Sequence, residues 1–193
     1  MRKIIVSEFI TLDGVFSDPG GAEGTKNGGW SFPFWHEDIA KFKFEELFAG
    51  DALLLGRRTY DGFAAAWPAM ADDAGFADRM NSIPKYVVTQ SDAGLTWNNS
   101  QSIRDDAAQK VTELKQAAGQ DILVFGSGQL VNFLTGHGLV DEFRLLVYPV
   151  VLGDGQRLFS GEGKRTLRLA ETRPFPTGVV LLSYETADIT VDQ

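Results

Sequence analysis

The chain has 193 residues, 44% of them hydrophobic, with 14 Phe and 4 Trp, which suffices for a packed core and argues against intrinsic disorder. Its 18 basic and 26 acidic side chains give a net charge of −8, which argues against a nucleic-acid partner, because phosphate binding needs a basic surplus. The chain has no cysteine and only 2 His, which excludes thiolate catalysis, disulfides and Cys- or His-rich metal sites, so we expect no metal. No apolar run approaches the ~20 residues of a membrane span. We therefore expect one cytoplasmic domain over residues 1–193 with no membrane partner.

The first half of the chain predicts a strand, a long loop and a helix. Residues 4–9 form a short β-rich run typical of a buried strand, although Glu8 interrupts its apolar residues. The segment behind it is rich in glycine, and a long loop inside a compact domain is usually functional. Residues 37–48 carry an apolar stripe at helical spacing, formed by Ile39, Phe42 and Leu47.

The remaining chain alternates strands and helices. We expect strands over residues 52–55, 85–89, 121–125 and 140–151, and helices over 104–118 and 128–134. A short helix capped by Thr59 should stop near Trp67, because Pro68 follows. Residues 167–172 and 179–185 predict a terminal hairpin. The pattern indicates an α/β protein with a mostly parallel central sheet and an antiparallel C-terminal hairpin.

The strongest local motif is Gly56-Arg57-Arg58-Thr59, directly after the apolar run Leu53-Leu54-Leu55. A strand that turns at a glycine into a helix presents free N–H groups and a positive dipole end, which attract an anion. Arginine's planar fork suits phosphate oxygens. The alternative is an ordinary turn with two solvated arginines.

A second turn of this kind is Phe125-Gly126-Ser127-Gly128-Gln129-Leu130. Small residues between a strand and a helix let the backbone approach a pyrophosphate closely. The Gly-x-Gly-x-x-Gly fingerprint of Rossmann folds is absent, and the turn is not the first in the chain. A simple tight turn is the alternative interpretation.

Leu12-Asp13-Gly14, with the glycine-rich segment behind it, is a candidate cover over a reaction centre. A reductase needs such a cover to exclude water from the path of the hydride. The alternative is a disordered surface loop.

Phe34, Trp35 and Asp38 form a candidate substrate wall at the start of the helix over residues 37–48. A carboxyl beside aromatic rings tends to keep its proton, which suits a proton donor or a ligand anchor. The alternative is a solvated acid favoured by the helix dipole.

Together and in this order, these segments resemble the dihydrofolate reductase superfamily. Gly56-Arg57-Arg58-Thr59 is similar to that family's cofactor motif, and Thr89-Gln90-Ser91 stands where the family contacts the adenosine 2′-phosphate. Gly126-Ser127 replaces a Gly-Gly pair on the pyrophosphate, and the helix with Asp38 is similar to the one carrying the family's active-site acid. The resemblance implies a three-layer α/β/α fold.

A closer resemblance is to the reductase domain of the bifunctional deaminase-reductases of riboflavin synthesis and its stand-alone relatives. It rests on Leu139-Val140-Asp141-Glu142-Phe143, on the run from Tyr148 and Pro149 to Gly155, and on Leu158-Phe159. The resemblance implies a homodimer and an NADPH-dependent reductase acting on a small pyrimidine- or pteridine-like molecule. Three groups of residues would hold the cofactor: Leu12, Asp13 and Gly14; Gly56, Arg57, Arg58, Thr59, Thr89, Gln90 and Ser91; and Gly126, Ser127, Gly128, Gln129 and Leu130. Phe34, Trp35, Phe63 and Pro149 would contact the substrate, and Asp38 would orient it or supply the proton.

Three functions stay open at this point. The substrate is either the ribosylaminopyrimidine phosphate of riboflavin synthesis or a dihydrofolate-like pteridine. A ligand-binding module without turnover and a structural protein are alternatives of other classes, distinguished by NADPH oxidation and by nucleotide-induced thermal shifts.

Overall fold

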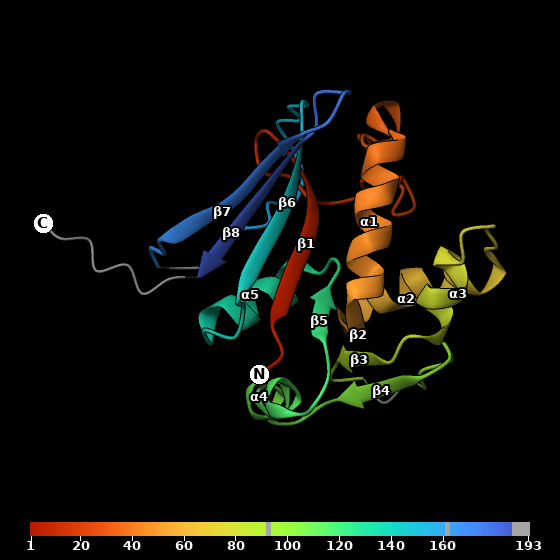
Figure 1. Ribbon diagram of the computed structural model, residues 1–193, viewed down its shortest axis with the longest axis vertical. Coiled ribbons are helices and arrows are strands. Elements are labelled where there is room, and N and C mark those ends of the chain that lie inside the picture. The colour runs from red at the N-terminus through yellow and green to blue at the C-terminus, as the bar shows by residue number, and fades with distance from the viewer. Residues whose placement is uncertain (92–93, 161–162, 187–193) are drawn as a thin grey trace, which may run out of the picture.

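The computed structural model describes residues 1–91, 94–160 and 163–186. This part of the chain forms one eight-stranded sheet in the order β4-β3-β2-β5-β1-β6-β8-β7 (Figure 1). The strands are β1 (Ile4–Thr11), β2 (Gly50–Gly56), β3 (Lys85–Val88), β4 (Ser100–Ile103), β5 (Asp121–Val124), β6 (Glu142–Tyr148), β7 (Leu167–Pro174) and β8 (Val180–Thr186). Neighbours from β4 to β6 pair in parallel, whereas β6, β8 and β7 pair antiparallel. The expected sheet with its C-terminal hairpin is therefore confirmed.

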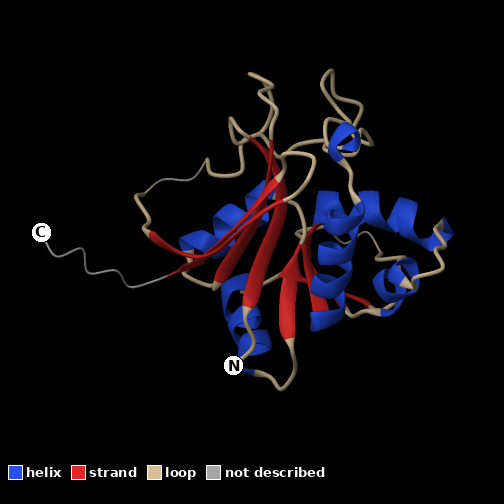
Figure 2. Ribbon diagram, turned by 45° about the horizontal axis from the view of Figure 1, so that its top comes forward, coloured by secondary structure: helices blue, strands red, loops and turns tan. Residues whose placement is uncertain are grey.

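Helices cover both faces of this sheet, as Figure 2 shows. They are α1 (Glu37–Ala49), α2 (Arg57–Ala66), α3 (Phe76–Ser82), α4 (Ala107–Gln116) and α5 (Gly128–Gly136), with short 3-10 turns at Phe32–Phe34 and Trp67–Ala69. None of the helices in the described ranges is both long and apolar enough to pass through a bilayer.

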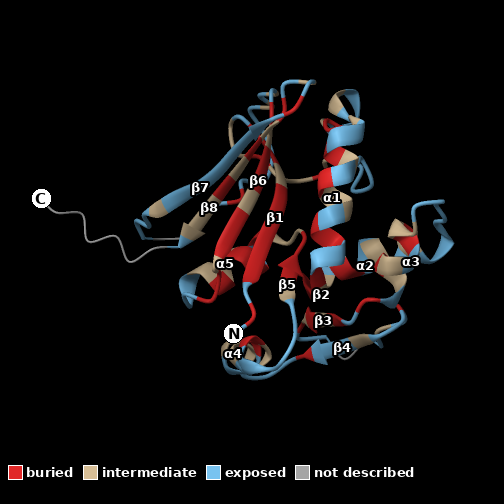
Figure 3. Ribbon diagram, in the orientation of Figure 1, coloured by how far each residue is buried: buried red, intermediate tan, exposed pale blue. Residues whose placement is uncertain are grey.

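Alternating side chains of the central strands build a core on each face. Ile4 and Val6 pack with Val131 of α5, whereas Ile5, between them, packs with Leu47 of α1. Because a strand sends successive side chains to opposite faces, this alternation requires helices on both sides. The three-layer α/β/α arrangement is thus confirmed, and Figure 3 shows the central strands as the buried part of the molecule.

Several element boundaries differ from those expected. Helix α2 begins at Arg57 with Gly56 as its N-cap, so the prediction that Thr59 caps it is wrong. Helix α4 begins only at Ala107, because Asp106 before it has a left-handed backbone. Strand β6 ends before Pro149, which has no N–H for a sheet hydrogen bond.

Candidate functional site

The two glycine turns that follow β2 and β5 lie against each other. A Cβ on Gly56 would stand 2.2 Å from Ser127 Oγ, and one on Gly126 would stand 2.9 Å from Thr59 Oγ1. Because real Cβ atoms essentially never come that close to atoms that are not bonded to them, a side chain at either position would force Ser127 or Thr59 to shift. The structure therefore places the two motifs side by side at one edge of the sheet. This edge is formed by the carboxyl ends of two adjacent parallel strands, which is where α/β proteins bind ligands.

The start of α2 has the features of an anion site. Its N-cap is Gly56, and no side chain accepts a capping hydrogen bond from its first turn. Arg57 Nε donates to both carboxylate oxygens of Asp61, at 2.9 and 3.0 Å. Arg58 forms an ion pair of 2.7 Å with Glu23 of the glycine-rich segment. Arg57 and Arg58, the two arginines predicted to bind phosphate, thus both lie at the start of α2, and each is paired with an acidic side chain.

The segment after β3 extends the same edge. Val88 is level with Gly56 in the sheet, so Thr89 follows beside Arg57. Thr89 is buried, and its Oγ1 accepts the backbone N–H of Ser91 at 3.0 Å. Predicted ligand residues from two neighbouring strands thus follow each other along this edge.

Arg104, which follows β4, is not among the predicted ligand residues. Together with Gln90 and Asp105 it lines a hollow of about 360 Å³. The only available signal was Arg104 itself, because the polar sequence Ser-Gln-Ser of β4 gave no strand pattern.

The glycine-rich segment is held in a defined fold. The buried Asp18 carboxylate accepts the backbone N–H of Glu23 and of Thr25, both at 2.9 Å, and the Thr25 hydroxyl at 2.8 Å. Trp30 is buried and donates its indole N–H to the carbonyl of Ser17 at 2.9 Å. The segment therefore has a defined, hydrogen-bonded structure, and its Phe16 ring would stand 2.7 Å from a Cβ on Gly128 of α5.

Asp13 ties the predicted cover to the late sequence signature. Its carboxylate accepts the Thr11 hydroxyl at 2.6 Å and the backbone N–H groups of Gly153 and Leu152 at 2.8 and 3.2 Å. The Thr11 hydroxyl and the N–H of Gly153 lower the pKa of Asp13 to about 2. Leu12 follows β1 and donates its N–H to Val150. The two segments thus form one unit, although 139 residues separate Asp13 from Leu152.

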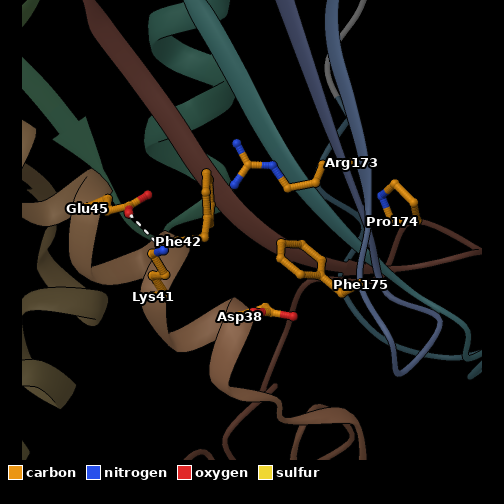
Figure 4. A pocket seen from close by; sticks show the side chains of 7 residues that line it. All are labelled: Asp38, Lys41, Phe42, Glu45, Arg173, Pro174 and Phe175. Atoms are coloured by element: carbon orange, nitrogen blue, oxygen red, sulfur yellow. Dashed lines mark ion pairs between the residues drawn. The ribbon is translucent and has the colours of Figure 1, made fainter.

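Asp38 lies in the first turn of α1, where its carboxylate is 55% exposed and 3.4 Å from His36 Nδ1. It lines a hollow of about 220 Å³ between α1 and the end of β7, which Figure 4 shows with Arg173 and Phe175 on the opposite side. The nearby Phe34 ring meets Tyr148 edge-on at 6.1 Å. The acid therefore stands beside a polar hollow, largely in contact with solvent.

The other predicted substrate residues are dispersed. Phe63 on α2 packs edge-on against Trp67 and Trp97, with centroids 6.4 Å apart in both pairs. Trp35 is 53% exposed, and Pro149 is exposed after β6. The turns after β2 and β5 are thus brought together, whereas the predicted substrate wall is not assembled around one cavity.

The chain is similar to known proteins in both sequence and structure. The protein YyaP of Bacillus subtilis is 33% identical over 187 residues, 95% of this chain and 94% of its own. Three solved structures share the fold, and each covers 96% of this chain. A Shewanella sp. PV-4 protein named for riboflavin biosynthesis has a TM-score of 0.76 and 17% identity, with 99% of that chain covered. A dihydrofolate reductase from Enterococcus faecalis complexed with NADP(H) has a TM-score of 0.62 and 14% identity with 97% covered, and a Thermotoga maritima deaminase/reductase has a TM-score of 0.63 and 17% identity with 57% covered. The model of the RibD C-terminal domain matches residues 2–181. The fold is thus that of dihydrofolate reductase, and the chain belongs to the RibD C-terminal domain family.

Proposed function

We propose that this protein is an NADPH-dependent reductase of a small pyrimidine- or pteridine-like molecule. The observation that carries the proposal is the close contact between the Gly56 and Gly126 turns, which brings the starts of two helices together at one edge of the sheet. Membership in the RibD C-terminal domain family supports a reductase. The Thermotoga maritima relative, named as a reductase of a phosphoribosylaminouracil, supports a pyrimidine substrate.

The residues at this edge fit a dinucleotide phosphate. The N-termini of α2 and α5 would bind the pyrophosphate through backbone N–H groups. Arg57, Arg58 and Ser91 would bind the 2′-phosphate, and Arg104 adds a guanidinium at the adjoining hollow. The segment from Leu12 to Gly14, fixed through Asp13, would cover the reacting end and exclude water. Bound there, a reduced nicotinamide supplies the hydride that no side chain can deliver.

NADPH oxidation is the direct test. The purified chain is incubated with NADPH and a panel of pterins, aminopyrimidines and simple carbonyls, and the loss of nicotinamide absorbance is followed. Oxidation that depends on one panel compound supports the proposal. NADPH binding with no oxidation across the panel would instead indicate a ligand-binding module.

Substitution of Arg57 tests 2′-phosphate recognition. We expect the wild type to bind NADPH more tightly than NADH, and Arg57→Ala to lose about 10- to 100-fold in NADPH affinity with little change for NADH, because a charged hydrogen bond contributes about 1.5–3 kcal/mol. Fluorescence titration measures both constants. Arg168→Ala on β7, an exposed arginine in an ion pair with Glu185, is the control. Equal wild-type affinity for both cofactors would rule out the 2′-phosphate assignment.

Glu23 places a carboxylate on Arg58, and we expect it to oppose phosphate binding. Since the pair is exposed, its electrostatic contribution is about 0.2–1 kcal/mol. Glu23→Gln should therefore tighten NADPH binding by about 1.5- to 5-fold at low salt, and the gain should vanish at high salt. Titrations at two salt concentrations measure this, and a weakened affinity would show that Glu23 supports the site.

A further inference from the structure

Strands β1 and β5 separate beside the Gly126 turn, and a buried acid lies at that point. The two strands pair only from Ile4 to Val6, whereas β1 continues along β6 as far as Thr11. Extending the register places Glu8 level with Gly126. Glu8 is 6% exposed, and a backbone hydrogen bond from Gly126 reaches its carboxyl. Its Oε1 atom has no hydrogen-bond partner within the described residues.

Glu8 is buried without an ion-pair partner among the described residues, unlike its neighbour Glu46. Lys43 and Glu46 of α1 act on it electrostatically, with opposite signs. Glu46, whose side chain is fully buried, accepts hydrogen bonds from Ser7 and Lys43 and from Arg144 at 3.3 Å, so it has two cationic partners. Glu8 has no ion-pair partner in the described structure. Helix α5 lies on the same face of the sheet as Glu8, and α5 carries no charged residue. Burial therefore raises the pKa of Glu8 to about 8.

We propose that Glu8 is the proton donor of the reduction, an assignment that rests on the proposed function. When hydride adds to the carbon of a C=N or C=O bond of the substrate, the π electron pair moves to the heteroatom. The Glu8 O–H bond then breaks and a new N–H or O–H bond forms. The Glu8 carboxylate that remains is stabilised by the Lys43 ammonium and regains a proton from water. Asp38, more than half exposed, lacks this environment.

Stability against pH tests the protonation state without cofactor or substrate. The unfolded Glu8 loses its proton near pH 4.5 and the folded one near pH 8, so between these values the folded chain binds more protons and wild-type stability should fall as pH rises. Glu8→Gln removes this dependence. The urea concentration at its unfolding midpoint should therefore rise relative to that of the wild type between pH 4.5 and pH 8. The exposed Glu45→Gln on α1 is the matched control and should follow the wild type. A constant difference between wild type and Glu8→Gln would overturn the proposal.

Kinetics test the transfer itself, with whichever panel compound the wild type reduces. Glu8→Gln should bind NADPH normally and lose about 100-fold or more in kcat, together with the high-pH limb of the kcat profile, while Glu8→Asp should recover part of the rate. A Glu8→Gln variant that keeps kcat within a few-fold overturns the donor assignment alone. A wild type that oxidises NADPH with no compound overturns the proposed function, and the donor role with it.

Discussion

Gly126→Ala is expected to destabilise the chain by about 2–5 kcal/mol and to remove measurable NADPH binding. Gly126 has a φ of +71°, which costs a residue with a side chain about 1–2 kcal/mol. Its new Cβ would lie 2.9 Å from Thr59 Oγ1 and 3.0 Å from Thr59 Cγ2, and such overpacking costs about 1–3 kcal/mol. Thr59 must shift to relieve this contact, and we expect its shift to push the turns after β2 and β5 apart. Urea unfolding and NADPH titration measure the two effects.

Gly62→Ala on α2 is the matched control for this substitution. Nothing lies within 4 Å of a Cβ at Gly62, and its backbone is helical. Alanine there should stabilise the chain by about 0.5–1 kcal/mol and leave NADPH binding unchanged. If Gly126→Ala is destabilised yet binds NADPH as the wild type does, the cofactor lies elsewhere and the proposed function loses its main support.

The central sheet could be predicted because its strands are buried on both faces. Continuous apolar runs such as Leu53-Leu54-Leu55 have few other structural explanations. Strand β4 and helix α3 were missed for the opposite reason. The sequence Ser-Gln-Ser-Ile of β4 lies at the edge of the sheet and is mostly exposed, and α3 has only seven residues. Neither segment carries enough periodic apolar residues to be distinguished from a loop.

The turns of the candidate site were also predictable, because glycine after a buried strand is a local signal. Their contact is not local, since it joins Gly56 to Ser127 across 71 positions of sequence. For the same reason the sequence showed Glu8 only as an interruption of an apolar run, and its environment depends on Gly126 and on α1. Long-range placement also separates Phe63 from Asp38, which an argument from motif order had grouped together.

Lys85→Met is expected to be the most destabilising of the charge-removing substitutions considered, at about 3–5 kcal/mol. Lys85 is fully buried, and its ammonium donates to the carbonyls of Ile83, Asn81 and Asn98 at 2.8, 3.0 and 3.1 Å. It also lies 4.1 Å from the centre of the Trp97 ring. Methionine fills similar space but leaves three carbonyls without this donor, that of Ile83 in a buried hydrogen bond and those of Asn81 and Asn98 in partly buried ones. A buried carbonyl left without a donor costs about 1–3 kcal/mol. Urea unfolding measures the loss, and the exposed Lys110→Met on α4 should stay within about 0.5 kcal/mol of the wild type.

The pH dependence of this loss has a defined sign. Burial lowers the pKa of Lys85 to about 8, against 10.5 for an ordinary lysine. Between pH 8 and pH 10.5 the unfolded chain binds more protons than the folded one. The free energy of unfolding of the wild type should therefore rise relative to that of Lys85→Met as pH rises through this range. A difference in stability between the two proteins that stays constant or narrows would show that the three carbonyls hold the ammonium charged above pH 8.

Cofactor binding by Lys85→Met should weaken as well, because Trp97 donates its backbone N–H to the Tyr60 hydroxyl at 2.8 Å, and Tyr60 follows Thr59 in the first turns of α2. Lys85 thus supports the helix on which the proposed phosphate site depends.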